Sequence, residues 1–94
     1  MKINNILVVC IGNICRSPMA EYFLKQKYPQ LHIESAGISA LVGNSADKKA
    51  CQSMLNYNID LKSHIAKQLN ADLIRQADLI LVMSQNQQKH IEKT

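Results

Sequence analysis

The sequence is poor in several residue types, and each shortage argues against a class of protein. It has no tryptophan, aromatic residues make up only 4% of its 94 residues, and its lysines are scattered along the chain. A nucleic-acid-binding surface normally combines a dense basic patch with aromatic side chains, so we predict no nucleic-acid partner. The chain also lacks an apolar stretch long enough to cross a bilayer, which predicts no membrane insertion.

Cysteines are few, and no signal peptide is recognisable. The three cysteines are an odd number and lack the spacing of a disulfide framework or a zinc site. We therefore predict neither a secreted disulfide scaffold nor a bound metal, and no cofactor. Met1 and Lys2 lead directly into the first apolar run. These features predict a cytoplasmic protein, and the mild net charge of +4 favours an anionic substrate.

Apolar runs alternate with amphipathic stretches along the chain. Continuous runs are typical of strands buried on both faces, and apolar residues at helical spacing are typical of helices. We predict strands at 5–9, 31–35 and 79–83, and helices at 18–28, 48–56, 71–76 and from Ser84 to about Ile91. This alternation predicts one α/β domain over residues 1–94, with an open parallel sheet and helices on both faces.

The predicted helices carry recognisable start signals and apolar faces. Ser17, Asp47 and Asn70 are the expected caps, and Pro18 fits the first helical position. The apolar faces of the first two helices are expected to comprise Met19, Ala20, Phe23 and Leu24 in one and Ala50, Cys51, Met54 and Leu55 in the other.

The segment from Cys10 to Ser17, CIGNICRS, joins the first predicted strand to the first helix. Ligands of an open parallel sheet bind beyond the carboxyl ends of its strands, which is where Cys10 lies. Loop amides at a helix N-terminus can converge on an oxyanion, and the guanidinium of Arg16 fits two phosphate oxygens. The same positive field favours the thiolate form of Cys10. The pattern therefore predicts nucleophilic attack on a phosphate ester.

From Cys10 to Glu21 the sequence CIGNICRSPMAE resembles the signature of the low-molecular-weight protein tyrosine phosphatases. Similar segments follow at 35–37, 40–43, 46–47, 60–64 and 77–83, so the resemblance covers most of the chain. The 40–43 loop has no tryptophan and is most similar to the bacterial branch, which acts on tyrosine autokinases of capsule and exopolysaccharide export. The resemblance implies a phosphotyrosine protein as substrate and such an autokinase as partner.

The resemblance also implies roles for the residues of this segment. Cys10 would attack phosphorus and become the phosphocysteine, Arg16 would bind the equatorial oxygens, and Ser17 would help to keep the thiolate. The phosphate-binding loop would comprise Ile11, Gly12, Asn13, Ile14 and Cys15. Cys15 is either a core thiol or, as the resemblance suggests, a partner of Cys10 in a protective disulfide.

Residues outside the segment receive supporting roles from the same resemblance. Asn13 would hold an unusual backbone conformation, which asparagine tolerates better than most residues. Ser35 and His64 would support Asn13, and a structural role for His64 is favoured over metal binding. Ile11 and Leu41 would line the slot for the aryl group.

One part of the family pattern is missing from these 94 residues. The family's general acid is an aspartate in an Asp-Pro-Tyr segment, whereas the only prolines here are Pro18 and Pro29. The chain thus resembles a member truncated at its C-terminus, without the fourth strand and last helix, and its uncovered sheet edge invites self-association. Asp47 and Asp78 are nominal replacements, but a helix cap and a strand start are the simpler interpretations. We expect activity skewed toward phenols that leave without a proton.

Two functions follow from these observations. The leading interpretation is an enzyme that hydrolyses phosphotyrosine through a cysteinyl-phosphate intermediate. The alternative is a phosphate- or phosphotyrosine-binding module with weak or no turnover, because the general acid is absent. Arsenate reduction is disfavoured because it needs further cysteines after Ala77. Arginine phosphatases of similar fold tend to have threonine where Ile11 stands.

Overall fold

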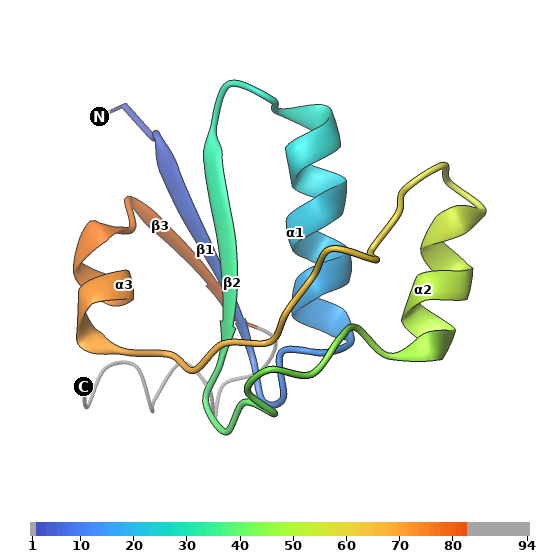
Figure 1. Ribbon diagram of the computed structural model, residues 1–94. Helices are drawn as coiled ribbons and strands as arrows, with labels where there is room; N and C mark the ends of the chain where they lie inside the picture. Colours follow the sequence, from blue (N-terminus) through green and yellow to red (C-terminus); the bar gives the residue numbers. More distant parts are fainter. Residues whose placement is uncertain (1, 83–94) are drawn as a thin grey trace.

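The computed structural model describes residues 2–82, which form a parallel sheet with helices on both faces. The elements are β1 (Asn5–Cys10), α1 (Arg16–Lys27), β2 (His32–Gly37), α2 (Lys48–Leu55), α3 (Ala71–Gln76) and β3 (Leu79–Val82) (Figure 1). The sheet has three strands in the order β2-β1-β3, and β1 is parallel to both neighbours. The predicted fold class is confirmed. Met83 and the predicted helix from Ser84 to Ile91 lie outside the described residues.

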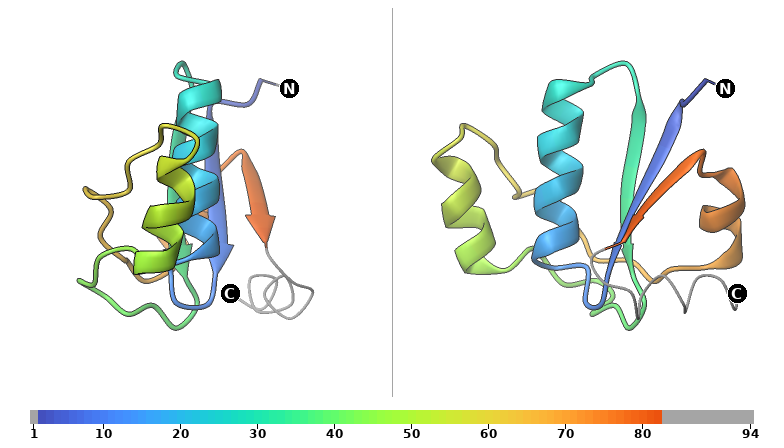
Figure 2. Two further views of the ribbon diagram at one scale, coloured as in Figure 1. Left: turned by 90° about the vertical axis from the view of Figure 1, so that its right-hand side faces the viewer. Right: turned by 180° about the vertical axis from the view of Figure 1, so that it is seen from behind.

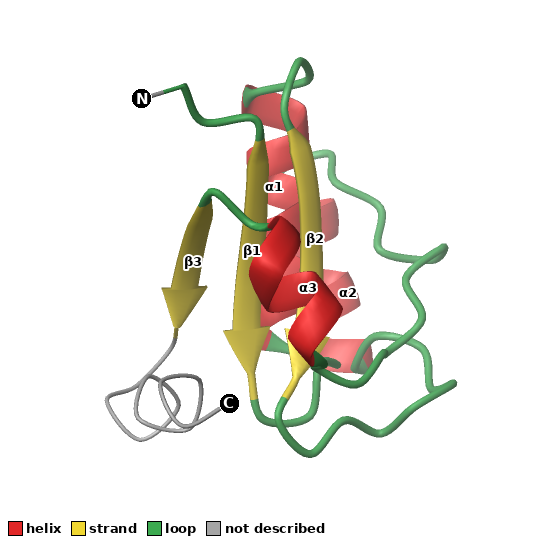
Figure 3. Ribbon diagram, turned by 90° about the vertical axis from the view of Figure 1, so that its left-hand side faces the viewer, coloured by secondary structure: helices red, strands yellow, loops and turns green. Residues whose placement is uncertain are grey.

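β1 is the central strand of the sheet, and helices cover both of its faces. Leu7 and Val9 pack on the side of α3, whereas Ile6 and Val8 pack on the side of α1. Figure 3 shows α3 on one face of the sheet and α1 on the other. Successive side chains of a strand point to opposite faces, so a strand buried on both sides needs an unbroken apolar run. This run carries the chain to Cys10 at the carboxyl end of the sheet.

α2 lies beyond α1, on the side away from the sheet (Figure 2). Asp47 caps it as predicted, since its carboxylate accepts hydrogen bonds from the amides of Lys49 and Ala50. Asn70 caps α3 through the amide of Leu73. An apolar cluster joins α2 to α1 and comprises Ala46, Ala50, Met54, Ile59 and Leu61, with Met19, Tyr22 and Cys51 packed against it.

The start of α1 differs from the prediction. The helix begins at Arg16, so Cys15 rather than Ser17 is the N-cap residue, and Pro18 is not the first helical residue. Ser17 is buried, and its hydroxyl contacts Cys10 and Asn13 instead of the helix amides. A tertiary contact has therefore overridden the local capping preference of serine.

Two predicted core residues and two strand bounds also need correction. Phe23 and Leu55 are 47% and 58% exposed, so neither belongs to a buried face. β1 and β2 run further toward their carboxyl ends than predicted, because pairing continues as far as Cys10 beside Gly37. The loop from Cys10 to Ser17 therefore begins directly where the pairing of β1 with β2 ends.

β2 and β3 are the edge strands of the described sheet. The carboxyl end of β2 is covered by a segment that follows His64, because Gly37 donates its amide to Lys67 and accepts from the amide of Leu69. None of the helices in residues 2–82 combines the length and apolar character that a bilayer span requires.

Candidate active site

The loop between β1 and α1 lies at the carboxyl end of the central strand (Figure 1). Every main-chain carbonyl from Cys10 to Cys15 accepts a hydrogen bond from outside the loop. The donors are, in order, the amides of Ile38, Ser39 and Leu41, the ring Nε2 of His64, and the amides of Asp47 and Met19, at 2.6–3.2 Å.

This outward pairing of the carbonyls decides where the loop amides point. The carbonyl of one residue and the amide of the next point in opposite directions across a trans peptide bond. The amides that follow these carbonyls are therefore turned toward the interior of the loop. Among residues 2–82, the amides of Gly12, Ile14 and Cys15 meet no protein acceptor. A ring of such amides at a helix N-terminus is suited to binding an anion.

The sulfur of Cys10 lies inside this loop and receives donors from it. The amide of Asn13 donates to Sγ at 3.2 Å, and the Oγ of Ser17 lies 2.8 Å from Sγ. The Nδ2 of Asn13 can only donate, and it donates to the same Oγ at 2.7 Å. The hydroxyl proton of Ser17 is therefore available to the sulfur. Hydrogen bonds to the charged form favour the thiolate.

Asn13 holds the loop in its shape. It is fully buried and adopts a φ of 58°, in the left-handed region that asparagine tolerates. Besides Ser17, its Nδ2 donates to the Oγ of Ser35 at 2.9 Å, and its Oδ1 accepts from the amide of Lys67 at 2.9 Å. Its own carbonyl accepts from Nε2 of His64 at 2.7 Å. The structure thus brings Ser35 and His64 against Asn13.

Glu21 belongs to this network, although the sequence interpretation gave it no role. It is only 7% exposed, and its carboxylate accepts the hydroxyl of Ser35. It also pairs with Lys25 at 2.5 Å, and its Oε1 lies 4.0 Å from Nδ1 of His64. The signal was present, because Glu21 is one helical turn from Ser17 and so shares its buried face.

Arg16 and the expected slot residues lie at the surface of the loop. Arg16 is the first residue of α1, and its guanidinium has no hydrogen-bond or ion-pair partner within the described part of the chain. Ile11 and Leu41 are 56% and 49% exposed, which is high for large apolar side chains. The amide of Leu41 donates to the carbonyl of Gly12, so the loop that carries Leu41 is fixed to the phosphate loop.

The remaining cysteines and the nominal acids lie elsewhere. Cys15 is exposed, so it is not a core thiol, and Cys51 is half-buried beside the cluster between α1 and α2. The carboxylate of Asp47 caps α2. Asp78 accepts the amides of Asn4 and Asn5 at the start of the sheet, and these bonds lower its pKa. Neither aspartate is placed to protonate a group bound at Cys10.

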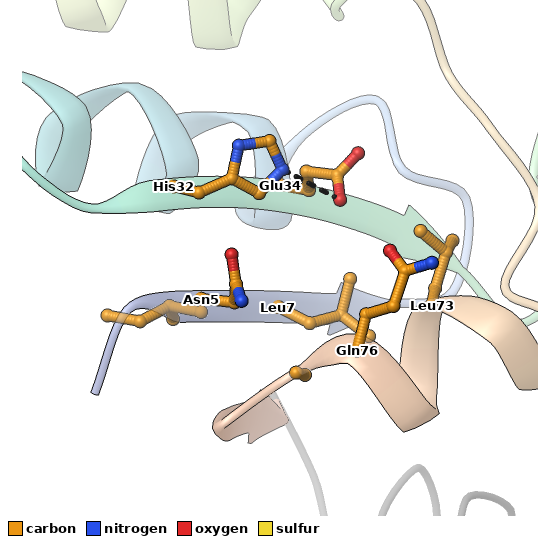
Figure 4. A pocket seen from close by; sticks show the side chains of 8 residues that line it. Asn5, Leu7, His32, Glu34, Leu73 and Gln76 are labelled. Carbon is orange, nitrogen blue, oxygen red and sulfur yellow. Dashed lines mark ion pairs between the residues drawn. The ribbon is translucent and has the colours of Figure 1, made fainter. Parts of the chain in front are cut away.

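A small cavity lies near the amino ends of β1 and β2, far along the sheet from Cys10. Its volume is about 20 Å³, enough for about one water molecule. Figure 4 shows its lining, with Asn5, Leu7, His32, Glu34, Leu73 and Gln76 labelled. It is too small for an aryl phosphate. Within residues 2–82, His, Cys, Asp and Glu side chains do not gather into a group that could hold a metal ion.

Comparisons with known proteins agree with this geometry. The family described as "Low molecular weight phosphotyrosine protein phosphatase" matches residues 5–94. The chain is 71% identical over 94 residues to the low molecular weight protein-tyrosine-phosphatase Ptp of Acinetobacter johnsonii, and it covers 66% of that protein.

Solved structures give the same result. The tyrosine phosphatase AmsI of Erwinia amylovora matches with a TM-score of 0.95 at 47% identity, over 98% of this chain and 61% of that one. Wzb of Vibrio vulnificus in complex with benzylphosphonate matches with a TM-score of 0.94 at 38% identity, over 98% of this chain and 66% of that one.

Proposed function

Because the chain belongs to the low molecular weight phosphotyrosine protein phosphatase family, we propose that it hydrolyses phosphotyrosine in proteins through a cysteinyl-phosphate intermediate. The chain spans between 57% and 66% of the length of the curated relatives it matches. The proposal therefore rests on the chemistry that its own described residues support.

The outward pairing of the loop carbonyls is the observation that carries the proposal. It leaves inward-facing amides around the sulfur of Cys10, which itself receives the amide of Asn13 and the hydroxyl of Ser17. Fixed donors around a developing negative charge stabilise a transition state without reorganisation at the moment of reaction. A phosphate ester that enters this ring presents its phosphorus to the thiolate.

The proposed reaction has two displacements. First, the Sγ of Cys10 attacks phosphorus, the S–P bond forms, and the P–O bond to the tyrosyl oxygen breaks. Arg16 and the loop amides bind the oxygens of the transferring phosphoryl group. Water then attacks phosphorus, the S–P bond breaks, and inorganic phosphate leaves with the thiolate restored. Ile11 and Leu41 would contact the aromatic ring of the substrate.

Protonation of the leaving tyrosyl oxygen is the step that the described residues do not supply. Every Asp and Glu of residues 2–82 is bound by another group, and none of them contacts Cys10 or Arg16. This observation favours a second candidate, a phosphotyrosine-binding module with weak turnover. A missing general acid costs about 10²–10⁴ in rate when the leaving group needs a proton.

Kinetics with a phosphotyrosine peptide, compared with p-nitrophenyl phosphate, distinguish the two candidates, because only the tyrosyl leaving group needs a proton. An enzyme forms a phosphate adduct on Cys10, visible by mass spectrometry after acid quench, and then releases phosphate over many turnovers. A binding module with weak turnover binds phosphate but releases little or none from the phosphotyrosine peptide. Cys10→Ser should abolish turnover, and Cys51→Ser, which changes a thiol outside the loop, should retain it. Turnover that persists in Cys10→Ser would contradict the proposal.

The partner and the compartment are part of the same proposal. The similarity to the bacterial branch supports a phosphorylated tyrosine autokinase of polysaccharide export as the substrate protein. The reactive thiolate supports a reducing compartment, and hence the cytoplasm. Within the described residues β3 is an edge strand, which supports self-association, and size-exclusion chromatography at several concentrations tests this directly.

A further inference from the structure

Gln68 forms a two-point contact with the loop that carries Leu41. Its Nε2 donates to the carbonyl of Ile38 at 2.7 Å, and its Oε1 accepts from the amide of Ala40 at 3.0 Å. A primary amide donates and accepts at once, which matches a backbone carbonyl and an amide two residues apart. Alanine supplies neither group, and glutamate supplies only the acceptor.

The loop held by Gln68 is attached on its other side to the phosphate loop. The amide of Ser39 donates to the carbonyl of Ile11, and the amide of Leu41 donates to the carbonyl of Gly12. The next tether along the chain is the amide of Gly43, which donates to the carbonyl of Ala66. Residues 38–41 therefore lie between Gln68 and the phosphate loop.

We propose that Gln68 is a positioning residue for the aryl slot: it holds the 38–41 loop so that Leu41 stands beside Ile11 at the mouth of the phosphate loop. This proposal rests on the proposed function, because it assumes that Leu41 contacts the aromatic ring. It assigns recognition of the aryl group and binding of phosphate to separate sets of contacts.

The separation follows from what holds the phosphate loop. Asn13 is fixed by Ser35, by the ring of His64 and by the amide of Lys67, and none of these bonds involves the side chain of Gln68. The amides of Ser39 and Leu41, which pair with the carbonyls of Ile11 and Gly12, are main-chain groups and do not need the Gln68 side chain. Loss of this side chain therefore loosens the wall of the slot, whereas the bonds that orient the anion ring remain. Gln68 is exposed, so water replaces part of each lost hydrogen bond and the fold is retained.

The experiment measures binding of benzylphosphonate and of inorganic phosphate to the 94-residue chain by isothermal titration calorimetry. We expect Gln68→Ala to weaken benzylphosphonate roughly three- to tenfold, as loss of one or two modest hydrogen bonds would, and to leave phosphate affinity unchanged. Gln68→Glu, which keeps the acceptor for Ala40, should give an intermediate loss. Gln52→Ala changes an exposed glutamine of α2 and should alter neither affinity.

The outcomes separate this inference from the proposed function. If Gln68→Ala weakens the binding of both ligands equally, or changes neither affinity, the proposed role of Gln68 is overturned. Phosphate binding by the wild-type chain would still support the anion site in that case. If Gln68→Ala does not fold, the same comparison with Gln68→Glu decides. A wild-type chain that binds neither ligand would overturn the proposed function and the role of Gln68 with it.

Discussion

Replacement of Ser17 by alanine tests how the thiolate of Cys10 is maintained. The hydroxyl of Ser17 lies 2.8 Å from Sγ and accepts from Nδ2 of Asn13, so its proton is directed to the sulfur. The sulfur lies in a residue that is only 5% exposed, where water does not readily replace a lost donor. We therefore expect Ser17→Ala to make Cys10 less reactive toward electrophiles.

The magnitude follows from the strength of a hydrogen bond to a charged group. Such a bond is worth about 1.5–3 kcal/mol, which corresponds to a roughly ten- to hundredfold change in the stability of the charged sulfur. The thiolate that remains is more basic and hence intrinsically more nucleophilic, with a Brønsted coefficient of about 0.4–0.5. About half of the logarithmic change survives, so we expect alkylation of Cys10 to slow roughly three- to tenfold.

The assay is the rate of iodoacetamide alkylation, followed by mass spectrometry in a Cys15→Ser background so that Cys10 is observed alone. The control is Ser35→Ala, which removes a buried hydroxyl that accepts from the same Nδ2 of Asn13 but has no hydrogen bond to the sulfur. Equal slowing by both substitutions would refute direct donation from Ser17.

Further predictions concern the stability of the fold, measured by urea unfolding. His64→Ala leaves the buried carbonyl of Asn13 without its donor and should lower the free energy of unfolding by about 1–3 kcal/mol. It should also weaken phosphate binding, and an unchanged phosphate affinity would contradict a role of His64 in the site. Leu7 of the central strand is 2% exposed, so Leu7→Ala should lower the free energy of unfolding by about 2–5 kcal/mol. A smaller loss would contradict the assignment of Leu7 to the core. The hydrogen bond from Lys67 lowers the pKa of Glu34 below 4.5, so this carboxylate stabilises the fold above that pH and its contribution is lost as the pH falls through the lowered pKa. Glu34→Gln should therefore lower the free energy of unfolding by at most about 1 kcal/mol near neutral pH, because the ion pair of Glu34 with Lys67 is partly exposed. In acid the substitution should have no effect, and a destabilisation that grows as the pH falls would contradict this prediction.

Local sequence patterns predicted the parts of the fold that depend on local chemistry. The unbroken apolar run before Cys10 could serve only a strand covered on both faces, and it became the central strand. Asp47 and Asn70 cap helices because nothing else competes for their oxygens. Ser17 carried the same signal, but its hydroxyl is used by Cys10 and Asn13, so the helix begins earlier.

Features that depend on distant segments were not predictable from one sequence. Glu21 of α1 is buried against Ser35 of β2, which donates a hydrogen bond to its carboxylate. The segment from His64 to Gln68 supports both the phosphate loop and the 38–41 loop, through contacts between residues that are 28 to 54 positions apart in the sequence. The family resemblance implied the support of Asn13 by His64, but Lys67 and Gln68 belong to no motif and no helical period, so only the packing of the chain shows what they do.

A titration of the ¹⁵N-labelled chain with inorganic phosphate, followed by amide resonances, tests the anion ring most directly. The account predicts saturable shifts centred on the amides of Gly12, Ile14 and Cys15, and much weaker binding in Arg16→Ala. Shifts confined to other parts of the chain, or phosphate binding that is indifferent to Arg16, would contradict it.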